Sequence, residues 1–233
     1  MEKRPRSRAE IFTAGTFFVL LFVAALAPIQ SYDVFWHLAA GEWIVGHRAL
    51  PQTDPFALAS DPVVWHNGEW LFEILLHGIE RASGLTGLAV FRALVVAGLF
   101  TAILVLVARA TGVATALVIV AFAFAGADHR LGVRPELAGI AFAVVATHLL
   151  LGPLTRGRLA LLTALTIVWM NMHPSALLAP AIAGLVAGGR WIAGERRRDD
   201  LAARAASVVL TLAALLVTPW GISGVLSPIR LAR

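Results

Sequence analysis

Long apolar runs separated by short polar breaks dominate the sequence. The runs cover about residues 11–28, 85–108, 111–127, 135–152, 158–172, 174–193 and 201–218. Apolar stretches of about 20 residues are typical of helices that cross a bilayer. Their continuous hydrophobicity, without alternation, excludes the strands of a membrane β-barrel. The pattern therefore predicts an all-α, polytopic membrane helix bundle with about seven spans, which together with its loops covers residues 11–218.

The first apolar run, 11–28, follows the basic segment 1–10 and ends at Pro28. A secretory signal peptide has the same order of charge and hydrophobicity. However, this run is longer than the apolar part of most signal peptides, and no convincing small-x-small cleavage site precedes Gln30. The sequence therefore favours an uncleaved first helix.

The segment 29–84 is polar where the rest of the chain is apolar. Residues 31–80 hold seven of the fourteen acidic residues, four of the seven histidines and four of the seven tryptophans. Apolar residues recur at helical spacing over 33–47, which begins with Asp33, a favourable N-cap residue. A second amphipathic pattern covers 68–83, after a turn-rich connector with two Asp-Pro pairs. We expect two amphipathic juxtamembrane helices in a first outer loop.

The distribution of basic residues predicts the orientation in the membrane. With the N-terminus inside, the inner segments hold most of the nineteen lysine and arginine residues. Because positive charge collects on the cytoplasmic side, we expect a cytoplasmic segment 1–10, with 29–84 and 219–233 at the outer face. The net charge of +5 is explained by the arginines of the inner segments, which can also contact anionic lipid. Nucleic acid is therefore not an expected partner. The absence of cysteine excludes disulfides and thiolate metal sites.

The same topology gathers chemically distinctive side chains at the outer face. In chain order they are Asp33, His37, His66, Glu69, Glu73, Arg130, Arg134, Asn171 and His173. Charged groups next to hydrocarbon are costly and are usually functional where they occur. We therefore expect a composite site with Asp33 at its centre.

Each of these side chains also has a structural interpretation. Asp33 can cap its helix, and His37, one turn later, can be its helix neighbour or can share a metal ion with it. Glu69 and Glu73 can form the wet face of an interfacial helix. The two arginines of the loop 128–136 can snorkel toward head groups or grip a phosphate or pyrophosphate. The outer tryptophans can form an interfacial belt or stack on sugars.

Several motifs resemble a group of bacterial polytopic membrane proteins related to the GT-C glycosyltransferases. They are S-Y-D-x-F-W-H-L-x-x-G-E-W-I, L-P-x-T-D-P-F, W-H-N-G-E-W-L-F-E, R-P-E-L at 134–137, W-M-N-M-H at 169–173 and P-W-G at 219–221. The resemblance covers nearly the whole chain. It implies an essential acidic residue and two juxtamembrane helices in the first outer loop, and a lipid-phosphate-linked sugar as substrate.

The chain also departs from this group in two respects. GT-C enzymes usually have further spans and often a soluble domain, whereas this chain has the seven-span module. Many members carry paired acidic residues in the first loop, whereas here Val34 follows Asp33. A divalent metal therefore stays open as a cofactor, and no metal ligands are assigned.

The resemblance implies an inverting glycosyltransferase of the bacterial inner membrane that transfers a sugar from a polyprenyl-phosphate donor to an acceptor at the outer face. Asp33 is then the general base that removes the proton of the acceptor hydroxyl, and His37 or His66 orients it. Arg130 and Arg134 hold the leaving lipid phosphate and stabilise its growing charge.

Glu69, Asn171 and His173 are expected to line the acceptor side of the same site. The partners are then membrane lipid and the lipid-linked sugar, and the identity of the sugar and of the acceptor stays open.

Two other functions are compatible with the sequence. A seven-span module with a belt of outer tryptophans also suits a non-catalytic structural subunit of a larger membrane complex. A transporter is a weaker alternative, because transporters usually carry broken helices or charges at mid-membrane depth. Here Arg92 and His148 fall within predicted spans, but toward their ends.

Overall fold

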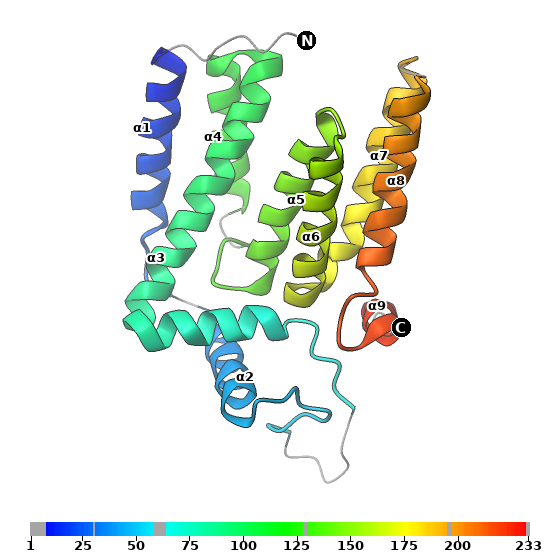
Figure 1. The fold of residues 1–233 in the computed structure, drawn as a ribbon. Coiled ribbons are helices and arrows are strands. Elements are labelled where there is room, and N and C mark those ends of the chain that lie inside the picture. Colours follow the sequence, from blue (N-terminus) through cyan, green and yellow to red (C-terminus); the bar gives the residue numbers. More distant parts are fainter. Residues whose placement is uncertain (1–7, 30, 58–63, 128–129, 195–196, 232–233) are drawn as a thin grey trace. The chain divides into compact units, whose positions relative to one another are not determined.

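The computed structural model describes residues 8–29, 31–57, 64–127, 130–194 and 197–231. Within these ranges the chain is helical (Figure 1), and the only β pairing is an isolated bridge between Thr53 and Val64. The prediction of an all-α fold is therefore confirmed.

Every apolar range predicted from the sequence contains a helix. The elements are α1 (Arg8–Ala25), α2 (Asp33–His47), α3 (Trp70–Thr111), α4 (Val113–Ala127), α5 (Pro135–Leu151), α6 (Arg156–Met172), the 3-10 helix η2 (Pro174–Leu177), α7 (Leu178–Ile192), α8 (Arg198–Ala214) and α9 (Gly221–Leu231).

Three helical stretches are long and apolar enough to cross a membrane. They are α1, α3 and Pro174–Ile192, in which η2 leads into α7. The helices α4 and α5 are apolar but shorter, and α6 and α8 have 17 residues each. A helix of that length rises roughly 25 Å, somewhat less than the ~30 Å of a hydrocarbon core. The structure thus supports membrane association through three helices, and seven spans stay a prediction.

Helices occur at both places predicted for the first polar loop. The predicted helix 33–47 is α2, with the same bounds. The predicted helix 68–83 is the first part of α3, which continues into the apolar part through Gly84. Gly84 has φ 64° and ψ −167°, a conformation that glycine adopts without the steric cost that a Cβ brings. It therefore marks the point where one helix ends and the next begins.

The chain forms two compact units, which are described separately. Unit 1 consists of residues 1–34 and 79–137, and unit 2 of residues 35–78 and 138–233.

In unit 1, the apolar part of α3 packs against α4 and holds the end of α1. Phe100 of α3 meets Phe124 of α4 edge-on, with ring centroids 5.3 Å apart. The buried Arg92 of α3 donates from Nη2 to the carbonyl oxygens of Ala25 and Ala27, both at 2.6 Å. The last carbonyls of a helix have no partner within it, and a cation there complements the helix dipole. Arg92 therefore fixes the end of α1.

In unit 2, α6, α7 and α8 lie side by side around a hydrophobic core (Figure 1). Its buried members are Ala146, Leu149, Leu150, Leu162, Trp169, Met170, Ala176, Ala179, Ala183 and Leu215. This core holds the C-terminal end of α6, which carries Asn171, and the start of η2, which His173 directly precedes.

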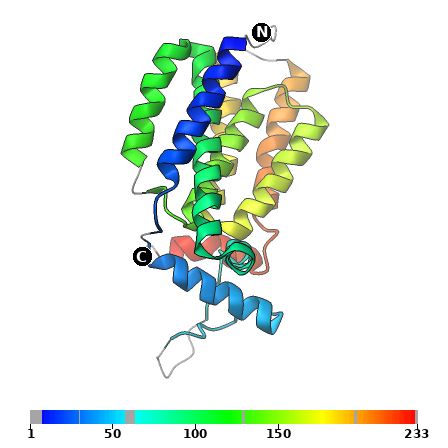
Figure 2. The ribbon, with the colours of Figure 1, turned by 90° about the vertical axis from the view of Figure 1, so that its left-hand side faces the viewer.

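The helix α2 crosses the first part of α3 at Gly41, and Figure 2 shows this first part of α3 end-on above α2. A Cβ at Gly41 would collide with the backbone carbonyl of Glu73 and would lie 2.9 Å from the Cβ of His77. The missing side chain therefore lets the two helices approach closely. As a result, α2 can bring His37, one helical turn before Gly41, against Glu73.

Candidate functional site

The predicted site residues fall into two groups, one in each unit. Asp33, Arg130 and Arg134 belong to unit 1, and His37, His66, Glu69, Asn171 and His173 belong to unit 2. Each group is built by its own helix ends and loops.

In unit 1, Asp33 and Arg134 form an ion pair, with 2.8 Å between Asp33 Oδ2 and Arg134 Nη2. Asp33 is the first residue of α2, and Arg134 directly precedes α5. Arg134 Nε also donates to Ser31 Oγ at 3.0 Å. The two charged side chains keep 57% and 40% of their surface exposed. The expected base and one expected phosphate-binding residue are therefore in direct contact and accessible.

Arg134 also lines a pocket of about 370 Å³ in unit 1. The polar side chains of its lining are those of Ser31, Arg92 and Arg134, and apolar residues such as Ile29 and Phe124 line the rest. Two guanidinium groups make the pocket positively charged, so it suits an anion attached to an apolar group. The exposed Arg130 is not part of this lining.

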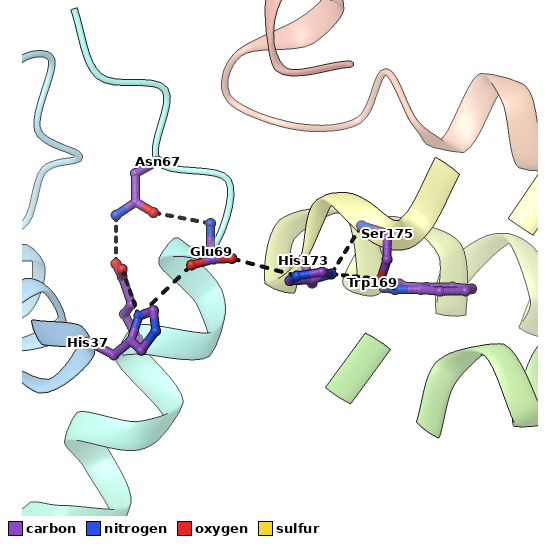
Figure 3. Close-up of polar contacts among 7 residues, drawn as sticks. His37, Asn67, Glu69, Trp169, His173 and Ser175 are labelled. Carbon is purple, nitrogen blue, oxygen red and sulfur yellow. Dashed lines mark hydrogen bonds and ion pairs between the residues drawn. The ribbon is translucent and has the colours of Figure 1, made fainter. Parts of the chain in front are cut away.

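In unit 2, His37, Glu69 and Glu73 bring three possible metal-ligand atoms together, and Figure 3 shows His37 next to Glu69. His37 Nδ1 lies 3.5 Å from Glu73 Oε1 and 3.9 Å from Glu69 Oε2. His37 and Glu73 are buried, with Glu73 only 1% exposed. The interpretation of Glu73 as part of a wet helix face is therefore wrong, because the face that carries it packs against α2.

The local sequence explains why the two carboxylates lie on one face at the start of α3. The backbone N–H of Glu69 donates to Asn67 Oδ1 at 3.1 Å, an Asx turn that leads into the helix. The backbone N–H of Glu73 then donates to the carbonyl of Glu69. Residues four positions apart lie on the same side of a helix, so both carboxylates point the same way. The helix start is a favourable place for negative charge.

The second oxygen of each carboxylate has a partner of its own. Asn67 Nδ2 donates to Glu73 Oε2 at 2.6 Å, and His173 Nε2 lies 3.8 Å from Glu69 Oε1. Consequently Glu73 Oε1 and Glu69 Oε2 are the oxygens directed toward His37.

A chain of hydrogen bonds orients His173. Trp169 Nε1 donates to Ser175 Oγ at 3.0 Å, and Ser175 Oγ lies 2.7 Å from His173 Nδ1. The backbone N–H of Ser175 also donates to His173 Nδ1 at 3.1 Å, so this nitrogen acts as an acceptor. Neutral His173 then carries its proton on Nε2, which faces Glu69. The hydrogen bonds thus run from a buried tryptophan to His173, and His173 Nε2 lies 3.8 Å from the Glu69 carboxylate (Figure 3).

The hydrogen bonds between Trp169, Ser175 and His173 lie so close to α5 that the facing position on α5, Gly139, has no room for a side chain. A Cβ at Gly139 would collide with Ser175 Oγ and would lie 3.3 Å from His173 Nδ1. The backbone of α5 therefore passes directly over the polar groups.

Tryptophan side chains line a second pocket, of about 250 Å³, in unit 2. Trp36, Trp65 and Trp220 line this tryptophan pocket together with Glu69 and Glu73. The rings of Trp36 and Trp65 lie 6.0 Å apart. The pocket combines aromatic faces with hydrogen-bonding groups.

His66 is half-buried in the lining of the tryptophan pocket. Its ring meets that of Trp220 edge-on at 5.4 Å. Trp220 also donates from Nε1 to the carbonyl of Asn67 at 3.1 Å.

Asn171 holds three segments of unit 2 together. Its Oδ1 accepts from Trp70 Nε1 at 2.9 Å, and its Nδ2 donates to the carbonyls of Ile167 and Val217, both at 2.8 Å. These contacts use the amide of a buried side chain, so they indicate a positioning role.

The sequence prediction did not include Asn67, Ser175 or Trp220 among the site residues. Asn67 and Trp220 lie within the motifs W-H-N-G-E and P-W-G, so the motifs could have identified both as candidate site residues. Ser175 follows His173 by two positions, and only its contact with Trp169 shows its role.

No protein-family model matches the sequence, and comparisons with curated proteins and with solved structures found no match. The chemistry of the two units is therefore the basis for a functional assignment.

Proposed function

We propose that this chain is an integral membrane glycosyltransferase. It transfers a sugar from a polyprenyl-phosphate donor to an acceptor at the outer face of the bacterial inner membrane. The observation that carries the proposal is the ion pair between Asp33 and Arg134 beside a positively charged pocket. A carboxylate and a guanidinium group are the two groups that such a transfer requires.

The reaction is a displacement at the anomeric carbon of the donor sugar. The acceptor oxygen forms the new bond to this carbon, and the bond from the carbon to the phosphate oxygen breaks. Asp33 takes the proton of the acceptor hydroxyl as general base. The lipid phosphate leaves with the bonding electrons, and attack opposite to it inverts the anomeric configuration.

Arg134 stabilises the charge that develops on the departing phosphate. Its Nη2 and Nε each hold one partner, Asp33 and Ser31, and a guanidinium group carries five N–H donors. Arg134 therefore has donors left for phosphate oxygens while it stays next to Asp33.

The composition of the unit 1 pocket supports a lipid phosphate as the leaving group. Arg92 and Arg134 supply positive charge, and Ile29, Phe124 and Leu131 supply apolar surface in the same pocket. Its volume of about 370 Å³ lies within the usual range of about 300–1,000 Å³ for ligand pockets.

The tryptophan pocket of unit 2 supports recognition of carbohydrate. Sugar rings offer C–H groups to aromatic faces such as those of Trp36 and Trp65. Their hydroxyl groups pair with carboxylates and amides such as those of Glu69 and Asn67, which also line this pocket.

The proposed topology has seven spans, with the N-terminus in the cytoplasm and residues 29–84 outside. Helices at all seven apolar ranges and the concentration of arginine in the predicted inner segments support it. Cysteine residues introduced at positions 42 and 157 can be labelled with an impermeant maleimide to test it. Position 42 should react from outside and position 157 from inside.

A transfer assay in lipid nanodiscs tests the function. The protein is supplied with a panel of polyprenyl-phosphate sugars and a matched panel of nucleotide sugars. Wild-type protein should transfer sugar from a lipid phosphate donor, and nucleotide sugars should be inert. Glu42→Gln, which removes an exposed carboxylate from the same helix, is the control and should be fully active.

Equal transfer by wild type and Asp33→Asn would remove Asp33 from the mechanism. If no donor reacts and the protein instead copurifies with stable partners, the chain is a non-catalytic subunit of a membrane complex.

A further inference from the structure

The geometry around His37 points to a metal site in unit 2. We propose that His37 Nδ1, Glu69 Oε2 and Glu73 Oε1 bind one divalent transition-metal ion. The three residues offer ligand atoms that all lie within 4.8 Å of one another. Binding depends only on these side chains and holds whether or not the chain transfers sugars.

The separations between the ligand atoms suit a metal ion of ordinary size. Two metal–ligand bonds of about 2.1 Å at a tetrahedral angle place their ligand atoms roughly 3.4 Å apart. His37 Nδ1 lies 3.5 Å from Glu73 Oε1 and 3.9 Å from Glu69 Oε2. The two carboxylate oxygens lie within 4.8 Å of each other, so side-chain rotations that shorten this separation bring all three atoms to bonding distance.

The charge of the cluster also calls for a cation. Glu69, which directly precedes α3, and Glu73 stand four residues apart, a spacing at which like charges repel, and Glu73 is 1% exposed. A buried carboxylate is unfavourable unless it is paired or binds a metal. The contacts of Glu73 within the described part of the chain come from Asn67 and His37, with no lysine or arginine among them. A divalent ion would neutralise both carboxylates.

Each carboxylate also contacts a residue that is not a proposed ligand, as metal-binding carboxylates usually do. Asn67 holds Glu73 Oε2, and His173, oriented by Ser175, faces Glu69 Oε1. Each outer contact leaves the other oxygen directed to the place where the ion would lie. Asn67 and His173 thus orient the two carboxylates without binding the metal ion themselves.

The ligand set selects a class of metal. Imidazole favours zinc, iron, copper and nickel, whereas magnesium and calcium prefer oxygen ligands alone. Three protein ligands with one open position are typical of catalytic zinc sites. Glu69 and Glu73 also line the tryptophan pocket, so a water molecule or a ligand in that pocket can occupy the open position. We therefore expect zinc, or a similar ion, that faces the pocket.

Zinc and cobalt are the probes for this site. The full chain is purified through a tag without histidine, stripped with a chelator and titrated with Zn²⁺ by calorimetry. One Zn²⁺ should bind per chain and should raise the melting temperature, because a ligand that binds the folded state stabilises it. Co²⁺ should give visible absorption bands of a site with nitrogen and oxygen ligands.

Matched variants locate the binding. Glu69→Gln and Glu73→Gln keep the shape of the side chains, and each should weaken Zn²⁺ binding by more than the 10–100-fold that loss of an outer partner causes. Glu42→Gln, exposed on α2, should bind as wild type does. Glu69→Gln is the milder substitution, because the side chain of Glu69 is 30% exposed, so its folding is expected to be intact.

Two results would overturn the proposal. One is wild-type protein that neither binds Zn²⁺ nor melts at a higher temperature in its presence. The other is Zn²⁺ binding of equal affinity in wild type, Glu69→Gln and Glu73→Gln, which would place the ion elsewhere on the surface. Neither result bears on the transfer assay with Asp33→Asn, so the two proposals fail separately.

Discussion

Asp33 and Arg134 are in direct ionic contact, with 2.8 Å between Asp33 Oδ2 and Arg134 Nη2, although they lie far apart in the sequence. Both side chains are substantially exposed. An exposed ion pair typically contributes about 0–1 kcal/mol to stability. The pair therefore adds little to the stability of the fold, and its accessibility suits a role in binding or catalysis.

Asp33→Asn should leave the fold intact. Loss of the exposed pair should lower the free energy of unfolding by less than about 1 kcal/mol, which for a chain of this length corresponds to about 2–4 °C in melting temperature. Thermal unfolding in detergent measures the shift, and Arg134→Gln should behave in the same way. A loss of more than about 10 °C in either variant would show that the pair is structural.

Gly41→Ala should destabilise the contact between α2 and the first part of α3. The new Cβ would collide with the backbone carbonyl of Glu73, which cannot rotate away. We expect a cost of about 1–3 kcal/mol, as for other overpacked contacts. Thermal unfolding compares it with Gly46→Ala on the same helix, where a Cβ meets nothing within 4 Å. Equal melting temperatures for the two variants would contradict the close approach of the helices.

Ser175→Ala should disturb the hydrogen-bonded chain that orients His173. The substitution leaves the buried Trp169 Nε1 without its acceptor and removes one of the donors to His173 Nδ1. A buried donor without a partner costs about 1–3 kcal/mol. Ser83→Ala, which removes an exposed bond within α3, is the control and should change stability by less than about 0.5 kcal/mol. If Ser175→Ala melts like this control, the chain of contacts is not formed.

The sequence predicts the helices well because their apolar runs are long and bounded by polar residues. The bounds of α2 agree with the prediction, and Gly84 lies between the predicted ranges 68–83 and 85–108. The number of membrane spans is less accessible, because it depends on where each helix ends. The helices α4 and α6 have 15 and 17 residues, a length at which hydropathy alone does not decide between a span and a shorter buried helix.

The sequence indicates which residue types belong to the site, but it does not indicate which of these residues contact one another. Asp33 and Arg134 stand out as charged residues beside apolar runs. By contrast, the burial of Glu73 depends on the close approach of α2 at Gly41, a contact between segments that no local pattern encodes. The role of Ser175 likewise depends on Trp169, a residue of the preceding helix.

The most direct test of the proposed function is the release of polyprenyl phosphate in a single turnover. Protein in excess over a labelled polyprenyl-phosphate sugar is mixed with acceptor in nanodiscs, and the free lipid phosphate is measured over time. Wild type and Glu42→Gln should release it at the same rate, whereas Asp33→Asn should be about 10²–10⁴-fold slower, as expected for loss of a general base. Release at the same rate by wild type and folded Asp33→Asn, or no release by any of the three proteins, would contradict the proposal.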